Sequence, residues 1–367
     1  MTPCRPVISV STISRWPARF GAGFAASLCL GMATATATAQ EAYAPRELPA
    51  RSIPVPADVS PQMQKLIAVP PRTNWDSVPQ TPEAWRTLAN TGAATAIQAL
   101  PALRERLHVK VEPLLLNGVK AYLVTPEVIP AKNRNRLLVH VHGGCYVLSP
   151  GEAGTSEAIL MAGLGHFKVL SVDYRMPPEA YFPAALDDAM TAWRAALTMA
   201  KPRNMAIFGS SAGGALTLEM ILRAKQEGLP LPAAIAPGTP MADVTKVGDS
   251  FQTNALLDNV LVSTDGLCDA AAKFYANGHD MKDPLLSPVY GDLSGFPPAI
   301  LTTGTRDLLL SNTVRVHRKL RQAGVEAELH VYEGQSHGQY GRDDTAPETR
   351  EAFGEIAAFF DRHLGKQ

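Results

Sequence analysis

Apolar residues follow two different patterns along the chain. Beyond about residue 107, short and nearly continuous apolar runs alternate with segments in which apolar residues recur with the period of a helix. The short runs predict strands at 137–141, 169–172, 206–208, 233–235, 299–303 and 327–331. The periodic segments predict helices at 183–199, 212–226, 265–276, 313–323 and 347–364. Buried strands that alternate with helices predict an α/β fold, in which a mostly parallel central sheet is flanked by helices on both faces.

Residues 40–107 have a different pattern. They are rich in proline and alanine, and they predict helices at 60–68 and 81–107 but no strand. Just after them, the pair Asn117-Gly118 separates two apolar stretches, which predicts a hairpin. We therefore divide the chain into an N-terminal helical segment, 40–107, and an α/β domain, 108–367.

The first 39 residues have the features of a secretory signal peptide. Three arginines precede a charge-free apolar stretch over 20–32, and the tripeptide Ala37-Thr38-Ala39 matches a cleavage site before Gln40. The alternative is a membrane anchor, but the apolar stretch is shorter than the ~20 residues that a spanning helix needs. The sequence therefore predicts export to the periplasm or the medium, with no stable membrane anchor.

Charge and cysteine content narrow the possible functions. The chain has 34 basic and 34 acidic residues, which gives no electrostatic argument for binding nucleic acid or an anionic membrane. Chemistry on a small molecule is the remaining default, and the sequence specifies no oligomeric state. Cleavage of the signal peptide leaves two cysteines, Cys145 and Cys268. Because Cys145 lies in a glycine turn, we expect the two to stay unpaired.

The sequence "MAIFGSSAGGALTLEM" carries the first candidate for catalysis. Its G-x-S-x-G core centres on Ser211, between a predicted strand and a predicted helix, with Gly209 and Gly213 on either side. Such a strand-turn-helix presents the serine hydroxyl above the sheet, and the N–H of Ala212 lies at the helix N-terminus, where it can stabilise an oxyanion. Ser211 is the predicted nucleophile, and Ser210 is expected to face elsewhere.

A second motif supplies further oxyanion donors. The residues His142-Gly143-Gly144-Cys145 directly follow the strand predicted at 137–141. Glycines allow main-chain N–H groups to point at a developing negative charge, so Gly143 and Gly144 are predicted to join Ala212 as donors. His142 and Cys145 are the supporting residues of this motif.

These motifs together resemble the hormone-sensitive-lipase branch of the α/β-hydrolases. "HGGC" and "GSSAGG" resemble its HGGG-type loop and G-D-S-A-G-G elbow, and "DYRMPPEAYFPAALDDA" and "DPLLSPVYGDLSGFPPAIL" resemble two further segments of the family. The resemblance covers roughly residues 110–365. It implies an α/β-hydrolase fold with a helical cap, which we expect to be formed by 40–107 and by an insertion at about 240–275.

The resemblance also implies the partners of the nucleophile. Asp307 matches the family's acid in G-x-x-D-x-L, and His337 follows the last predicted strand, in the chain order Ser, Asp, His of this fold. Asp343 and Asp344 also lie near His337, but they follow it in the wrong order. All three predicted residues come after strand ends, where parallel sheets collect their sites.

Other features of the sequence are weighed against this interpretation. His140 and His142 could suggest a metal pair, but no third ligand accompanies them, so no metal and no cofactor are expected. Three residues depart from the family pattern: Cys145 replaces its third glycine, Ser210 replaces the acid before the nucleophile, and Ser311 replaces a second Asp. The last two departures remove negative charge near the triad and put the pH optimum in doubt.

The sequence therefore predicts a serine carboxylic-ester hydrolase. It would act on short- to medium-chain acyl esters through the Ser211-His337-Asp307 triad, an acyl-enzyme and water. A lactone hydrolase with the same triad is the alternative, and an amidase or peptidase would use the same groups. The alternative outside the enzymes is a non-catalytic protein that has the same fold and binds small molecules.

Overall fold

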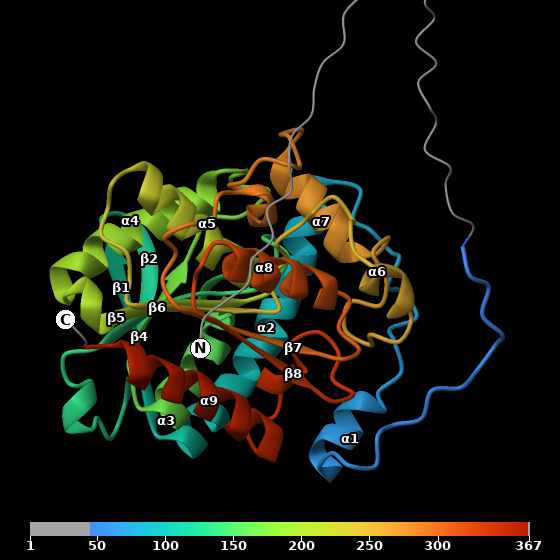
Figure 1. Ribbon diagram of the computed structural model, residues 1–367, viewed down its shortest axis with the longest axis horizontal. Helices are drawn as coiled ribbons and strands as arrows, with labels where there is room; N and C mark the ends of the chain where they lie inside the picture. The colour runs from blue at the N-terminus through green and yellow to red at the C-terminus, as the bar shows by residue number, and fades with distance from the viewer. Residues whose placement is uncertain (1–44, 366–367) are drawn as a thin grey trace, which may run out of the picture. The chain divides into compact units, whose positions relative to one another are not determined.

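The structure is a computed structural model that describes residues 45–365 (Figure 1). The predicted signal peptide, 1–39, lies outside the described residues. Residues from Ile53 onward form one compact unit, and residues 45–52 contain no helix or strand. In the described part of the chain, no helix has both the length and the apolar character needed to cross a membrane.

Eight strands form one sheet with the order β1-β2-β4-β3-β5-β6-β7-β8. The strands are β1 (Val109–Leu116), β2 (Val119–Pro126), β3 (Leu137–Val141), β4 (Lys168–Asp173), β5 (Met205–Ser210), β6 (Ala234–Gly238), β7 (Ala299–Gly304) and β8 (Ala327–Tyr332). β2 is antiparallel to β1 and β4, and the other neighbours are parallel. Asn117 and Gly118 both have positive φ, 48° and 92°, which confirms the predicted hairpin. Every predicted strand is present.

The helices agree with the periodic segments, except for two that were not predicted. The α-helices are α1 (Pro61–Ile67), α2 (Pro82–Leu107), α3 (Ser156–Gly165), α4 (Ala184–Met199), α5 (Ala212–Gln226), α6 (Ser250–Thr253), α7 (Leu267–Ala276), α8 (Leu310–Gln322) and α9 (Pro347–His363). Helix α3, whose residues 158–162 are all buried, was not predicted, because a helix that is apolar on every side has no polar face to reveal its period. The short α6 was also missed.

Each strand contributes side chains to two separate apolar cores. Along β3, Val139 and Val141 belong to the core that also includes residues of α4, α5 and α8, whereas Leu138 belongs to the core of α3 and α9. In β5, Ile207 and Phe208 divide in the same way. In Figure 1, α4 and α5 lie above the strands and α3 and α9 below them. The sheet is therefore covered on both faces, as predicted.

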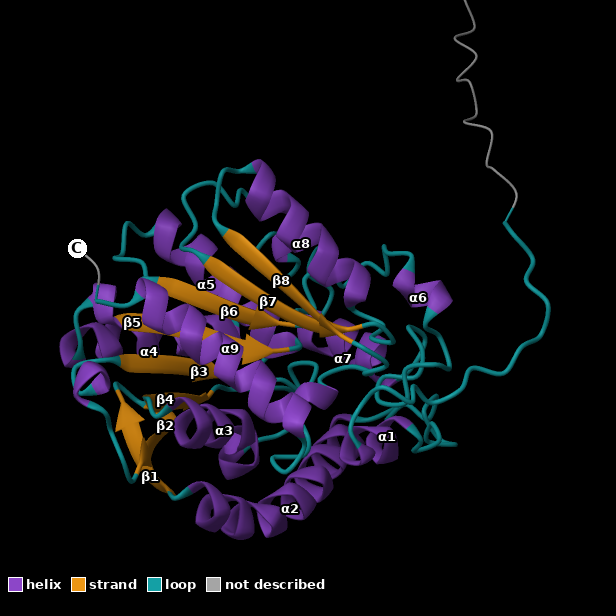
Figure 2. Ribbon diagram, turned by 60° about the horizontal axis from the view of Figure 1, so that its bottom comes forward, coloured by secondary structure: helices purple, strands orange, loops and turns teal. Residues whose placement is uncertain are grey.

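The carboxyl ends of four parallel strands carry the predicted site. The glycine motif follows β3, the elbow follows β5, Asp307 follows β7 and His337 follows β8. Because these strands are parallel, their carboxyl ends lie at one edge of the sheet (Figure 2).

Candidate active site

The elbow at Ser211 requires a conformation that its glycine neighbours make possible. Ser211 has φ 63° and ψ −123° between the end of β5 and the first turn of α5. A Cβ atom on Gly209 or on Gly213 would lie 2.0 Å from the carbonyl oxygen of Val141 in the neighbouring strand. Only glycine at both positions lets the turn pass this close to β3. The predicted strand-turn-helix at Ser211 is therefore confirmed.

His337 and Asp307 meet as the sequence predicts. His337 Nδ1 lies 3.0 Å from Asp307 Oδ1, and both residues are buried. The carboxylate also accepts hydrogen bonds from the Thr303 hydroxyl (3.0 Å), the Leu309 N–H (2.7 Å) and the Thr239 hydroxyl. These donors fix the orientation of the carboxylate, which in turn favours the imidazole tautomer with hydrogen on Nδ1 and leaves Nε2 free to accept a proton.

The loop after β6 links the elbow to this pair. The N–H of Ser211 donates to Gly238 O at 2.9 Å, and the N–H of Met241 donates to Ser211 O at 3.0 Å. Between these two residues, Thr239 Oγ1 lies 3.2 Å from His337 Nδ1 and donates to Asp307. The loop after β6 thus connects the backbone of Ser211 to the His337–Asp307 pair, and no hydrogen bond joins the Ser211 hydroxyl to His337 in the described structure.

The two other acids near the histidine have separate partners. Asp344 accepts two hydrogen bonds from the guanidinium of Arg106, at 2.7 and 2.9 Å. Asp343 accepts hydrogen bonds from the backbone and the hydroxyl of Thr345. Neither carboxylate orients His337.

The peptides that carry the predicted oxyanion donors are held from their carbonyl sides. The Tyr174 hydroxyl donates to His142 O at 2.7 Å, and His142 Nδ1 donates to Gly143 O at 2.7 Å. In a trans peptide the N–H points away from the C=O, so these bonds fix the N–H directions of Gly143 and Gly144. For Ala212, the carbonyl of Ser211 plays the same part, because it accepts from Met241 and Ala215. Within the described residues no protein group accepts these three N–H groups, which are free to bind an oxyanion.

His142 acts here as a neutral hydrogen-bond donor. Burial lowers its pKa to about 4, so the ring carries one hydrogen at neutral pH, and the short contact with Gly143 O places that hydrogen on Nδ1. The ring stacks on Tyr174 with centroids 4.1 Å apart. The neighbouring His140 faces Ser171 and Glu157 instead, so the two histidines do not share a ligand.

The prediction that the two cysteines stay unpaired is wrong. Cys145 and Cys268 form a disulfide, with Cα atoms 5.5 Å apart. The glycine turn does not prevent the bond, because Cys145 itself adopts φ 52° and its Sγ reaches α7. The next residue, Tyr146, stacks on Tyr275 of α7 with centroids 4.5 Å apart. Two adjacent contacts therefore hold the glycine loop, residues 142–146, against α7.

The residues that depart from the family pattern have specific contacts. The Ser210 hydroxyl bonds to Glu157 Oε1 at 2.8 Å and to the Tyr340 hydroxyl at 2.6 Å, so it faces away from the site as expected. Glu157 thereby places a carboxylate beside this position, and the expectation that Ser210 simply removes negative charge there needs correction. Ser311 exchanges backbone-to-hydroxyl hydrogen bonds with Ser250 of α6, each 2.9 Å long.

Sequence reasoning missed Asp258, a second buried acid beside the pair. Its Oδ2 accepts from the N–H of Leu308 at 2.9 Å and from the N–H of His337 at 3.3 Å, so it joins the loops that carry the acid and the base. Burial, and then the charge of Asp307, raise the pKa of Asp258. No spacing in the sequence indicates this role, because the residues that Asp258 joins are 50 and 79 positions away. Thr239 and Tyr174 were missed for the same reason, and Thr303, four positions before Asp307, was missed as well.

Glu219 of α5 is a buried acid that predicts a pH dependence of stability. The Tyr146 hydroxyl donates to its Oε1 at 2.6 Å, and burial raises the pKa of Glu219 to about 8. Between an ordinary pKa near 4.5 and about 8, the folded protein keeps a proton that the unfolded chain has lost. The contribution of this group to the free energy of unfolding therefore falls as pH rises through that window.

We expect Glu219→Gln to flatten the stability curve over that window. Relative to the parent protein, the variant should gain stability as pH rises from 5 to 8, because glutamine has no proton to lose. Urea unfolding at each pH unit measures this difference. Glu105→Gln, at an exposed position, is the matched control and should run parallel to the parent curve. A parallel curve for Glu219→Gln as well would show that this acid does not titrate differently on folding.

Comparisons with known proteins agree with this geometry. The profile described as "alpha/beta hydrolase fold" matches residues 138–341. An esterase of known crystal structure is 44% identical, with a TM-score of 0.84 over 87% of this chain and 99% of that chain. An esterase described as a member of the bacterial hormone-sensitive lipase family is 28% identical, with a TM-score of 0.69 over 83% of this chain and 99% of that chain. A carboxylesterase of Mycobacterium tuberculosis is 31% identical over 74% of this chain and 86% of its own length. The chain therefore belongs to the α/β-hydrolase fold family, is similar to its bacterial hormone-sensitive-lipase-like esterases, and is an enzyme of the esterase and carboxylesterase type.

Proposed function

We propose that this enzyme is a serine hydrolase of short- to medium-chain carboxylic esters. The observation that carries the proposal is the 3.0 Å contact between His337 and Asp307 beside the strained elbow at Ser211. In the proposed reaction, His337 Nε2 takes the proton of Ser211 Oγ while that oxygen attacks the ester carbonyl. The carbonyl oxygen becomes an oxyanion that accepts hydrogen bonds from the N–H groups of Gly143, Gly144 and Ala212.

The second half of the reaction uses the same groups. His337 gives its proton to the leaving alcohol oxygen as the C–O bond breaks, and the acyl group stays on Ser211. Water then loses a proton to His337 and attacks the acyl carbon, which releases the acid and regenerates the serine. Asp307 stabilises the imidazolium in both halves. No cofactor is part of this scheme.

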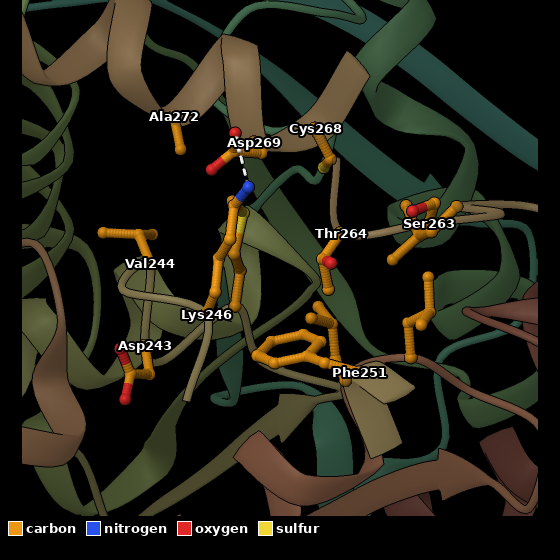
Figure 3. Close-up of a pocket in the computed structure, with 13 residues that line it drawn as sticks. Asp243, Val244, Lys246, Phe251, Ser263, Thr264, Cys268, Asp269 and Ala272 are labelled. Atoms are coloured by element: carbon orange, nitrogen blue, oxygen red, sulfur yellow. Dashed lines mark ion pairs between the residues drawn. The ribbon is translucent and has the colours of Figure 1, made fainter. Parts of the chain in front are cut away.

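A small cavity adjoins two segments of the site, although no triad residue and no predicted oxyanion donor lines it. It lies between the loop after β6, the segment after Asp307 and α7, and its lining includes Met241, Leu308 and Cys268 (Figure 3). The cavity has a volume of about 40 Å³, and most of the side chains that line it are apolar. An ion pair between Lys246 and Asp269, 3.1 Å apart, runs along one wall. The proposal of a short acyl group is supported by a relative in Streptomyces hygroscopicus, 30% identical over 65% of this chain, which is named an acetyl-hydrolase.

The proposal can be tested with the parent protein by two measurements. Turnover of p-nitrophenyl esters from acetate to palmitate, of γ-butyrolactone and of an anilide ranks the substrate classes. Labelling with a fluorophosphonate, followed by peptide mass spectrometry, identifies the nucleophile. We expect fastest turnover of the short esters and a label on Ser211. Faster lactone opening with the same label would favour the lactonase alternative, whereas no turnover and no label would favour a binding protein.

We also propose that the protein is exported. The pattern over residues 1–39 supports this, and so does the disulfide, because such bonds persist mainly in oxidising compartments. Fractionation of the source cells, with the mature N-terminus determined by sequencing, checks it. Cleavage before Gln40 and absence from the cytoplasm are the expected results.

A further inference from the structure

A second cleft lies at the opposite edge of the sheet from the candidate active site. Its lining includes the first residues of β3 and β4 and the residue before β5, which are Leu137, Lys168 and Asn204. These are the amino ends of parallel strands, whereas Ser211, Asp307 and His337 follow carboxyl ends. The cleft has a volume of about 470 Å³, within the range of pockets that hold small molecules.

The lining of this cleft is strongly basic. Among the described residues that line it, none is acidic and five are basic: Arg134, Arg136, Lys168, Lys201 and Arg203. Arg136 forms an ion pair with Asp361 of α9, which also pairs with Lys132. The other four form no ion pair with any residue in the described part of the chain. Because the whole chain has a formal net charge of zero, this is a local concentration of positive charge.

The four cations that form no ion pair within the described residues create a positive electrostatic field around the cleft. Cations at the rim of a concave, low-dielectric surface raise the local concentration of anions. Guanidinium groups match the geometry of phosphate oxygens, and lysine adds point charge. Asn135 and Asn204 add neutral hydrogen-bonding groups to the lining, and Leu123 and Met199 add apolar surface.

We propose that this cleft is a binding site for a multiply charged phosphorylated molecule. Arg134, Lys168, Lys201 and Arg203 balance the negative charge of the phosphate groups. The remaining volume of the cleft holds the organic part of the ligand. The ligand is distinct from the ester substrate, because the cleft lies at the opposite edge of the sheet. This site is independent of the proposed function.

Calorimetric titration of the full protein with sodium pyrophosphate tests the proposal. We expect saturable binding at 25 mM NaCl that weakens at least about tenfold at 250 mM NaCl, because screening acts directly on exposed charges. The double variant Lys168→Gln/Arg203→Gln should bind at least about tenfold more weakly. The control Lys282→Gln/Arg318→Gln removes one lysine and one arginine at exposed positions elsewhere and should bind like the parent protein.

A second arm separates a soluble ligand from a lipid headgroup. Cosedimentation with vesicles of phosphatidylcholine alone, or with added phosphatidate, reports binding to phosphate on a lipid. The site is supported if the parent protein and the control bind pyrophosphate or phosphatidate vesicles and the cleft variant does not. The arm in which binding occurs shows whether the phosphate belongs to a soluble molecule or to a lipid. No binding in either arm, equal loss in the control variant, or equally strong binding of sodium sulfate overturns it. Unchanged thermal unfolding and ester turnover in the cleft variant show that it is folded.

Discussion

Ser211→Ala is expected to lower kcat/KM for p-nitrophenyl acetate by between about 10⁴- and 10⁶-fold. The variant keeps the oxyanion donors and the His337–Asp307 pair but has no oxygen to form the acyl-enzyme. Residual activity should therefore be slow, and no burst of nitrophenol should precede steady turnover. Stopped-flow measurements on the parent protein and the variant, with equal concentrations of folded enzyme, provide the comparison.

The adjacent serine provides a matched control for this substitution. Ser210 loses the same atom in Ser210→Ala, but its hydroxyl contacts Glu157 and Tyr340 and not the predicted nucleophile's partners. We expect this variant to keep its burst and to lose less than about tenfold, through a small shift of the elbow. If Ser210→Ala loses the burst and Ser211→Ala keeps it, the nucleophile is Ser210 and the prediction of Ser211 is wrong. Equal, slight losses in both would remove serine catalysis altogether.

The elements with a clear hydrophobic period could be predicted from the sequence, and those without one could not. The strands beside the elbow, β3 and β5, are nearly continuous apolar runs; both ends of β3 were predicted correctly, and the ends of β5 to within two residues. Helix α3 is also continuous and apolar, but its period is hidden because every side packs against protein. A continuous apolar run in the sequence is thus typical of a short buried strand, and a short buried helix with the same run is easily overlooked.

The candidate site shows a similar division. Ser211, Asp307 and His337 could be predicted because each follows a strand in a fixed chain order. Thr239 and Tyr174 could not be predicted. Their hydroxyl groups donate to Asp307 and to the carbonyl of His142, partners that only the folded backbone brings close. A threonine after a strand is too common to indicate a role. The groups that orient the site are therefore visible only in three dimensions.

The cysteine pair was missed because 123 positions separate its members and the glycine turn suggested a different use for Cys145. In the structure the two uses coincide. Gly144, Cys145 and Tyr146 have φ angles of 112°, 52° and 64°, and the disulfide fixes the centre of this left-handed run to α7. Since a left-handed run is unfavourable for residues that have a Cβ, the bond to α7 supports the loop that carries two of the predicted oxyanion donors.

Cys145→Ser/Cys268→Ser is expected to lower the free energy of unfolding by about 2–5 kcal/mol, because the bond closes a loop of more than a hundred residues in the unfolded chain. We also expect kcat to fall more than KM rises, because the oxyanion donors act on the transition state. Guanidinium unfolding and steady-state kinetics, each with and without a phosphine reductant, measure both effects.

The reductant separates the bond from the side chains. It should move the parent protein toward the behaviour of the double variant and leave the double variant unchanged. Because Tyr146 stacks on Tyr275 independently of the bond, we expect the loop to retain part of its order and the variant part of its activity. An equal response of both proteins to the reductant, or titration of two free thiols in the unreduced, unfolded mature protein, would show that the loop is held by ring stacking and packing alone.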